Sequence, residues 1–396
     1  MSPRASIAAI ITARALRAFA DGLVSVLLPI HLLALGYDAV AVGAVATATL
    51  LGSAAVTLSV GLWARRLPLR AVLLAGCALM VATGLAFFAI DALWAMLVIA
   101  VIGTLNPSTG DVSLFLPLEQ ARLADLVPAD KRTSVYARYS LVAAMAGALG
   151  TLAAGWPAMR GIDARWGFMG YVVVGLVLAA IYARLPLPAA APETAAPPSG
   201  GLSPATRKPI LILSGLFCVD AFGGGFVLQS LMALWLFDRF GMSVEAATQA
   251  LFTMNVLGGL SHLAAPWVAR RLGLVNTMVF THLPANLCLA LAPFAPTLGI
   301  ALALLFVRAS LSSMDVAPRA ALIMSLVPPE ERAAATSVTA VPRALASAGA
   351  PIVAGWLLAA SPFGWFAVVG GGLKAVYDIL LLLVGRRLMR GRDDGN

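Results

Sequence analysis

The chain has 396 residues, of which 61% are hydrophobic and 11% are charged, and its formal net charge is +9 at pH 7. No soluble protein of this length needs so apolar a composition for its core, which excludes an ordinary globular enzyme and indicates a protein that lies mostly in lipid. The basic residues occur between apolar segments and form no folded basic module, which argues against nucleic-acid binding.

Clusters of Arg, Lys, Pro or Gly interrupt the apolar runs and divide the chain into twelve segments. Each segment approaches the roughly 20 residues that a helix needs to cross a bilayer. The segments are expected at 7–35, 38–62, 69–90, 92–119, 133–158, 166–186, 209–237, 242–268, 273–293, 297–326, 333–360 and 362–386. We therefore expect an all-α integral membrane protein with twelve transmembrane helices in two pseudo-symmetric six-helix bundles. The bundles are expected at 1–186 and 209–396, with a Pro/Ala-rich cytoplasmic linker at 187–208 and a short cytoplasmic tail.

Short motifs recur about 200 residues apart and indicate that the two halves are copies. Ala64-Arg65-Arg66-Leu67 returns as Ala269-Arg270-Arg271-Leu272, and Gly155-Trp156 returns as Gly355-Trp356. Two homologous halves around a shared site are an architecture of secondary transporters, because one half can rock against the other.

The basic residues also predict the orientation of the chain. Loops after even-numbered segments carry Arg65, Arg66, Arg70, Arg122, Lys131, Arg132, Arg184, Arg207, Lys208, Arg270, Arg271 and Arg332, whereas the opposite loops carry only Arg160, Arg165 and Arg239. The positive-inside rule then places both termini in the cytoplasm. The Ala-rich composition suggests a bacterium, so we expect a multi-pass protein of the cell inner membrane.

Charges within the first helix are candidates for coupling transport to protons. Arg14, Arg17 and Asp21 fall on one side of the helix, with Asp21 near mid-membrane. Asp21 either binds and releases a proton as its exposure alternates, or is permanently neutralised by Arg14, Arg17 or a neighbouring helix. Asp220 lies at the corresponding depth of segment seven, and the same alternatives apply to it.

Segment four contains Asn106-Pro107, then Asp111 and Glu119. Asp111 lies deeper and is a further coupling candidate, whereas Glu119 is expected at a solvated cytoplasmic interface. In segments five and eleven, glycines such as Gly147 and Gly150 either serve close helix packing or take part in gating.

Segment ten has a polar stripe. Arg308, Ser312, Asp315 and Arg319 are spaced by four, three and four residues, which places them on one helix face. The stripe either faces a substrate cavity, with Arg308 and Ser312 as substrate contacts and Asp315 as a coupling candidate, or contains an i, i+4 pair of Asp315 with Arg319.

Two further arginines occupy similar places in the two halves. Arg138 in segment five and Arg343 in segment eleven either clamp an anionic group or pair with Glu119, Asp111 or Asp315. Lys374 and Asp378, one turn apart in segment twelve, are expected to pair with each other.

The histidines and cysteines show no ligand pattern. His282 with Asn286, and His262 with Asn255, are each expected to form a polar patch, and His31 lies alone on another helix. Cys77, Cys218 and Cys288 are widely spaced, so no disulfide framework or metal site is predicted. Because no nucleotide loop, zinc motif or catalytic triad occurs, we expect no cofactor and no enzymatic activity.

The turn between the second and third segments carries a resemblance to a known family. Gly61-Leu62-Trp63-Ala64-Arg65-Arg66-Leu67-Pro68-Leu69-Arg70 is similar to the basic turn of the major facilitator superfamily, which typically reads Gly-x-Leu-Ala-Asp-Arg-x-Gly-Arg-Arg. Arg65 stands where the family has an acid that helps to lock the cytoplasmic gate, and the second copy at Arg270 and Arg271 also lacks it. These arginines are either gate residues or anchors at the cytoplasmic interface.

The glycines of segments five and eleven also resemble the pattern of that superfamily's proton-linked exporters, with Ala350-Pro351 in place of the usual Gly-Pro. The resemblance implies a secondary active transporter that moves a small molecule by alternating access, and we favour proton-coupled efflux by a monomer among membrane lipids. The alternative is an uptake or exchange carrier for a small organic or inorganic anion. A membrane-embedded enzyme, a lipid flippase and a receptor without turnover are less favoured.

Overall fold

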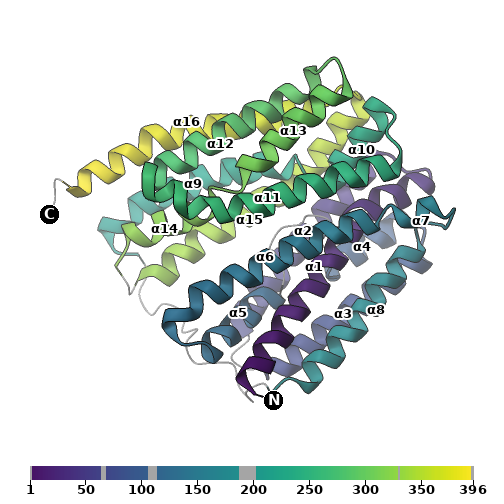
Figure 1. Ribbon diagram of the computed structural model, residues 1–396, viewed down its shortest axis with the longest axis horizontal. Helices are drawn as coiled ribbons and strands as arrows, with labels where there is room; N and C mark the ends of the chain where they lie inside the picture. Colours follow the sequence, from purple (N-terminus) through teal and green to yellow (C-terminus); the bar gives the residue numbers. More distant parts are fainter. Residues whose placement is uncertain (1, 64–67, 106–113, 187–201, 329–330, 394–396) are drawn as a thin grey trace. The chain divides into compact units, whose positions relative to one another are not determined.

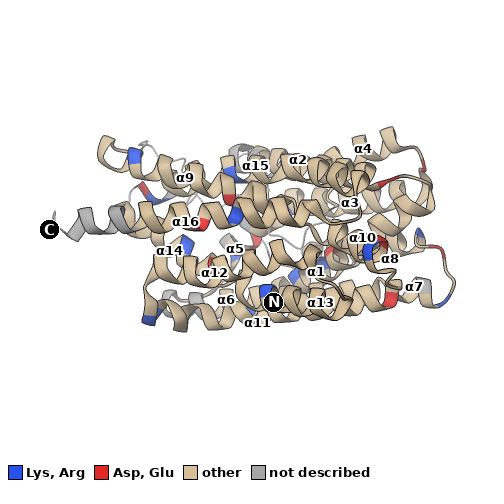
Figure 2. Ribbon diagram, turned by 90° about the horizontal axis from the view of Figure 1, so that it is seen from above, with Lys and Arg blue, Asp and Glu red and all other residues tan. Residues whose placement is uncertain are grey.

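The computed structural model of the protein describes residues 2–63, 68–105, 114–186, 202–328 and 331–393. Within them the chain forms helices α1 to α16 and one 3₁₀ turn, and no strand (Figure 1). Nine of these helical stretches are long and apolar enough to cross a membrane. Charged residues are sparse along the helices, as the colours of Figure 2 show.

The chain groups into two compact units that do not coincide with the two halves of the sequence. Unit 1 comprises Met1–Ala195 and Leu228–Asn255, and unit 2 comprises Ala196–Val227 and Val256–Asn396. Helix α10 (Gln229–Phe240) therefore belongs to unit 1, and α11 (Val244–Leu272) begins in unit 1 and ends in unit 2.

Unit 1 is built from pairs of packed helices. Its other helices are α1 (Pro3–Ala34), α2 (Ala39–Trp63), α3 (Leu69–Ala89), α4 (Leu93–Ile102), α5 (Phe115–Leu126), α6 (Ala129–Ala153), α7 (Trp156–Met159) and α8 (Trp166–Arg184). Helix α1 packs against α6, α2 against α4 and α3 against α8. A Cβ on Gly150 would lie 1.9 Å from the Phe19 carbonyl oxygen, so glycine lets α1 and α6 meet backbone to backbone.

Unit 2 repeats two of these pairings. It contains α9 (Pro204–Gly225), α12 (Leu274–Leu291), the turn η2 (Ala292–Phe294), α13 (Leu298–Ser312), α14 (Val316–Leu326), α15 (Arg332–Ala360) and α16 (Trp365–Asp393). Helix α9 packs against α15 as α1 does against α6, and α12 packs against α16 as α3 does against α8. The glycine at the first of these seams is Gly225, whose Cβ would lie 2.3 Å from the Ser347 carbonyl oxygen.

Four expected segments are each divided into two helices, of which segment five gives α6 and the short α7. Segment four gives α4 and α5, segment seven gives α9 and α10, and segment ten gives α13 and α14. Segment seven breaks directly after Gly223–Gly225, because consecutive glycines are poor helix formers. In segment ten the helix restarts after Asp315 with Pro318 in its first turn, where the missing N–H is tolerated.

Most of the linker expected at 187–208 falls on residues that the structure does not describe. Residues 187–201 lie outside the described ranges, but α9 begins at Pro204, so residues 204–208 are helical.

Candidate functional site

Unit 1 contains a buried cluster around one carboxylate, which we call the Glu119 cluster: Glu119, Arg17, Tyr139 and Tyr182. Arg17 on α1 donates from Nη2 to Glu119 Oε2 at 2.7 Å and from Nη1 to Oε1 at 3.1 Å, a two-pronged ion pair. Tyr139 on α6 and Tyr182 on α8 donate their hydroxyls to the same carboxylate. Glu119 is 2% exposed. The expectation that Glu119 lies at a solvated interface is therefore wrong, because four helices enclose it.

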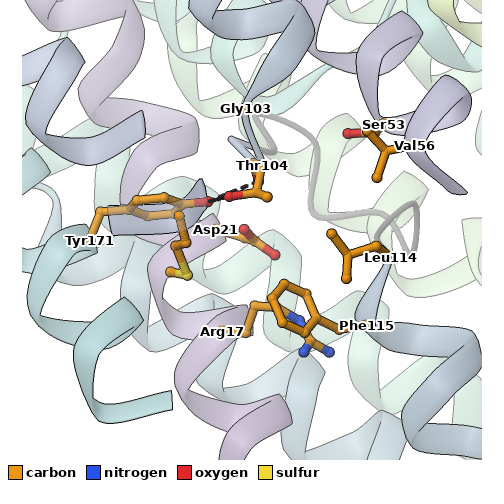
Figure 3. Close-up of a pocket in the computed structure, with 10 residues that line it drawn as sticks. Arg17, Asp21, Ser53, Val56, Gly103, Thr104, Leu114, Phe115 and Tyr171 are labelled. Carbon is orange, nitrogen blue, oxygen red and sulfur yellow. Dashed lines mark hydrogen bonds between the residues drawn. The ribbon is translucent and has the colours of Figure 1, made fainter. Parts of the chain in front are cut away.

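Next to this cluster, a small cavity of about 20 Å³ lies against Asp21. That volume is enough for a water molecule. Figure 3 shows Asp21 and Arg17 from α1, Thr104 and Tyr171 around the space, with Phe115 below them. The Tyr171 hydroxyl donates to the Thr104 carbonyl oxygen at 2.8 Å, which fixes one wall of the cavity.

The charges of α1 are buried as expected, but they do not form one simple group. Arg17 directs its guanidinium to Glu119 and stacks over Phe115, with its Cζ 4.6 Å from the ring centre. Arg14 lies 5.5 Å over the ring of Tyr139. Arg17 forms its ion pair with Glu119, and Asp21 lines the adjoining cavity.

A hydrogen-bonded trio of neutral side chains joins α6, α10 and α11 within unit 1. Gln229 Nε2 donates to Thr151 Oγ1 at 2.7 Å, and Asn255 Nδ2 lies 3.1 Å from Thr151 Oγ1 and 3.2 Å from Gln229 Oε1. Thr151 is fully buried. The sequence associated Asn255 with His262 and did not identify Thr151 or Gln229, since the three lie up to 104 residues apart.

Unit 2 contains a buried ionic cluster, which we call the Asp220 cluster: Asp220, Lys374, Arg319 and Asp315. Asp220 on α9 pairs with Lys374 on α16, and its Oδ2 lies 3.0 Å from Arg319 Nη2 on α14. Arg319 also pairs with Asp315, which confirms the expected i, i+4 pair. All four are buried. Buried charges in lipid-spanning helices pair in this way because an isolated one is costly.

Beside it lies a second polar group, the His282 group, made of His282, Asp378 and Asn286. His282 Nδ1 is 3.0 Å from Asp378 Oδ1, and Asn286 donates from Nδ2 to Asp378 Oδ2 at 2.7 Å. The expected patch of His282 with Asn286 is confirmed by their 3.1 Å contact. The expected pair of Lys374 with Asp378 is wrong: Lys374 turns to Asp220 on another helix.

Arg308 on α13 stands apart from both polar groups of unit 2. In the part of the chain that the structure describes it forms no ion pair, and its Nε is buried without a hydrogen-bond partner. Ser312 lies one turn further along the same helix and is half-buried. The other substrate-contact candidates are exposed, Arg138 on α6 in unit 1 and Arg343 on α15 in unit 2, and neither has a described ion pair.

The remaining candidates belong to loops and helix ends. Arg65, Arg66 and Asp111 lie outside the described residues, and Gly61 is near the end of α2. Arg70 donates to the Leu185 carbonyl oxygen at 2.9 Å. Arg270 and Arg271 are exposed at the end of α11, where Arg271 lies 4.2 Å over the ring of Trp267. These contacts fit interfacial anchors.

Comparison with known proteins gives one family and a set of similar folds. The family model described as "Major Facilitator Superfamily" matches residues 10–351. A curated relative, "Uncharacterized membrane protein YJR124C" of Saccharomyces cerevisiae, is 24% identical over 410 aligned positions that cover 92% of this chain and 91% of the relative.

Several solved structures have the same fold. A mutant of the nucleoside transporter NupG aligns with a TM-score of 0.77 at 14% identity, covering 96% of this chain and 99% of its own. A D-xylose-proton symporter aligns at 0.72 with 15% identity, covering 95% and 97%. A bacterial homologue of the iron transporter ferroportin aligns at 0.72 with 16% identity, covering 97% and 99%. These likenesses confirm the predicted fold class of twelve helices in two bundles.

Proposed function

Because this chain belongs to the Major Facilitator Superfamily and is a membrane transporter, we propose that it exports a small molecule in exchange for protons. The observation that carries the proposal is the position of Asp21: a carboxylate in the middle of α1, 7% exposed, lining a cavity large enough for water. A buried acid with a water-sized space beside it can take up a proton without meeting bulk solvent.

The surroundings of Asp21 support a coupled role. Arg17, the nearest basic residue of the cavity wall, is held by Glu119, so protonation of Asp21 does not leave that guanidinium without an anion. Gly22, the next residue, packs against the backbone of Gly147 on the glycine-rich α6, where a Cβ would meet the Gly147 carbonyl oxygen at 2.0 Å. A change of charge at Asp21 therefore occurs directly beside a close helix seam.

Proton coupling also agrees with the fold neighbours, of which one is named a proton symporter. Export as the direction is supported by the glycine pattern of α6, which is similar to that of proton-linked exporters in the superfamily.

The test uses everted membrane vesicles with an imposed acid interior, in which an exporter accumulates its substrate. Suitable probes are uridine, D-xylose and ferrous iron, after the neighbours' names, together with ethidium and benzoate. We expect accumulation of at least one probe in wild type, and Asp21→Asn to abolish the response to the pH gradient while retaining exchange of labelled for unlabelled probe. The exposed Asp163→Asn serves as the matched control and keeps both activities. Accumulation by Asp21→Asn that follows the pH gradient as in wild type would contradict the proposal.

A second candidate function is uptake or exchange of a small anion, and Arg308 favours it. A guanidinium in a membrane-spanning helix with no described counter-ion is a ready site for a carboxylate or an oxyanion. Exchange of labelled benzoate or phosphate without any imposed gradient, lost in Arg308→Gln and kept in the interfacial control Arg271→Gln, would support this candidate over proton-coupled export.

A further inference from the structure

We propose that His282 and Asp378 of unit 2, oriented by Asn286, form a second proton-binding site that holds one proton between the imidazole and the carboxylate. The site deepens the proposed function, on which its role in transport rests. The four acids named from the sequence as coupling candidates do not include either residue. Protonation here adds one H⁺ to the pair, breaks no covalent bond and needs no co-reactant.

The hydrogen-bond chemistry of the imidazole is the first argument. A neutral histidine has one N–H and one lone pair. Both ring nitrogens of His282 face carboxylates: Nδ1 lies 3.0 Å from Asp378 Oδ1, and Nε2 lies 4.0 Å from Asp220 Oδ1. With a neutral ring and two ionised acids, one lone pair points at a negatively charged oxygen. One added proton, on the ring or on Asp378, removes that repulsion.

The charge balance is the second argument. The contacting groups contain three carboxylates, on Asp220, Asp315 and Asp378, and two permanent cations, on Arg319 and Lys374. The formal sum is therefore −1 when the His282 ring is neutral and zero when the site holds one proton. Because an uncompensated charge is costly in a membrane interior, the neutral, protonated form fits this buried position.

The three acids differ in the number of cations that contact them, and this difference indicates which carboxylate shares the proton. Asp220 forms ion pairs with Lys374 and Arg319. Asp315 also pairs with Arg319, so both acids are stabilised as carboxylates. Asp378 has no cation in contact in the described residues; its partners are the His282 ring and the Asn286 amide. Asp378 is fully buried. It is therefore the carboxylate for which a shared proton is most favourable.

The neighbouring helices carry further charged and titratable groups, of which the balance counts those in contact with one another. Helix α9 contributes Asp220, α14 contributes Arg319 next to Asp315, and α16 contributes Lys374 and Tyr377, whose ring lies edge-on to His282 at 6.2 Å. Two more arginines lie on helices of the same unit. They are Arg308 on α13 and Arg343 on α15, and neither contacts a carboxylate of the group in the described residues.

Glycines bring the helices together and keep the site enclosed. A Cβ on Gly371 of α16 would lie 2.7 Å from the Asn286 carbonyl oxygen, and a Cβ on Gly223 of α9 would lie 2.8 Å from Lys374 Cγ. The Asn286 side-chain oxygen is buried with no described hydrogen-bond partner. After a rotation of the amide, this oxygen can accept a proton from His282 or from protonated Asp378, so the site has a spare acceptor for the moving proton.

The chain offers a direct measurement, because it contains only three histidines. Full-length protein labelled with ¹⁵N-histidine in lipid nanodiscs gives three ring signals, and His31→Gln and His262→Gln assign His282 by elimination without altering the site. Infrared difference spectra of the same samples report a protonated carboxyl by its carbonyl stretching band. The two methods together detect the proton on either partner.

Over a range of pH, we expect wild type to show one proton shared between His282 and Asp378, seen in the His282 ring signals or as a protonated carboxyl band. In Asp378→Asn the shared-proton signal of His282 and the carboxyl band should be lost, and Asp378→Glu should restore part of the shared-proton signal. A single neutral tautomer of His282 throughout the range, with no carboxyl band that Asp378→Asn removes, overturns the proposal.

The transport role is tested in the everted vesicles with whichever probe wild type accumulates. We expect His282→Gln to lose pH-driven accumulation and keep exchange, as the control His262→Gln keeps both. Unchanged pH dependence in His282→Gln overturns the role of the site in coupling. If the spectra show the shared proton but wild type accumulates no probe with the pH gradient, the proposed function fails and the proton-binding site stands.

Discussion

Four helices of unit 1 meet at one side chain, the carboxylate of Glu119. Arg17 comes from α1, Tyr139 from α6 and Tyr182 from α8, while Glu119 itself is on α5. Removing one partner of a buried ion pair leaves the other charge uncompensated, at a cost of about 3–5 kcal/mol.

Glu119→Gln should therefore be among the most destabilising single substitutions in unit 1, because it leaves Arg17 buried without an anion. We expect a clear fall in the midpoint of thermal unfolding in detergent. The double variant with Arg17→Leu should recover part of the loss, since neither charge then remains. Asp125→Asn, on the same helix but in a partly exposed pair with Arg122, should change stability by at most about 1 kcal/mol. Equal effects of the two substitutions would contradict this prediction.

The sequence predicts the contacts of buried polar residues only where both partners lie on the same helix. Asp315 and Arg319 pair as their spacing indicates, and so do His282 and Asn286. Lys374 has the same spacing to Asp378 but binds Asp220, which is 154 residues away. Helical periodicity identifies neighbours on one helix and contains no information about partners on another, so the Glu119 cluster and the His282–Asp378 contact could not be predicted.

At the scale of elements, the close contacts between α1 and α6 and between α9 and α15 depend on glycines, which have no side chain to separate the helices. At Gly150 an added methyl group would meet the Phe19 carbonyl oxygen at 1.9 Å, and that atom is backbone and cannot rotate away. The two helices would have to separate.

Gly150→Ala should accordingly destabilise the protein by about 1–3 kcal/mol through overpacking. The control is Gly215→Ala on α9, where no heavy atom lies within 4 Å of the added Cβ and alanine is the better helix former. We expect a lower unfolding midpoint for the first variant and an equal or higher midpoint for the second. An unchanged unfolding midpoint for Gly150→Ala would contradict this prediction and would mean that α1 and α6 can move apart at little cost.

The positions of the helices follow from hydropathy far better than their continuity does. Apolar runs place α1, α2, α3, α8 and α12 within a few residues. The break between α9 and α10 lies inside a run that remains apolar, so hydropathy does not report it. The break between α13 and α14 lies at residues 313–315, within the polar stripe of a segment that is long enough for one continuous helix. Local backbone chemistry causes them, at Gly223–Gly225 and ahead of Pro318.

At the scale of the whole molecule, the packing units and the sequence repeat divide the chain differently. Residues 228–255 follow the linker in sequence but pack within unit 1. There α10 lies against α1, and Gln229 and Asn255 satisfy the buried Thr151 hydroxyl.

Separate expression of two fragments, 1–195 and 196–396, tests this arrangement. The first fragment alone lacks α10 and the start of α11, so we expect low abundance of it in membranes. Co-expression with the second fragment should raise its level severalfold, and Gln229→Ala with Asn255→Ala in the second fragment should reduce that rescue. Quantitative immunoblots of a tag on 1–195 give the result. Full abundance of the lone fragment would show that unit 1 is stable without residues 228–255.

The same division has a consequence for the order of synthesis. Residues 1–195 are synthesised before residues 228–255. The roughly 60 residues from 196 to 255 take about 3–12 s to synthesise at common rates of elongation. During that interval Thr151 has neither Gln229 nor Asn255 as a partner. Insertion of this protein therefore includes a waiting stage, in which the earlier helices are already in the membrane while the part of the chain that completes them is still being translated.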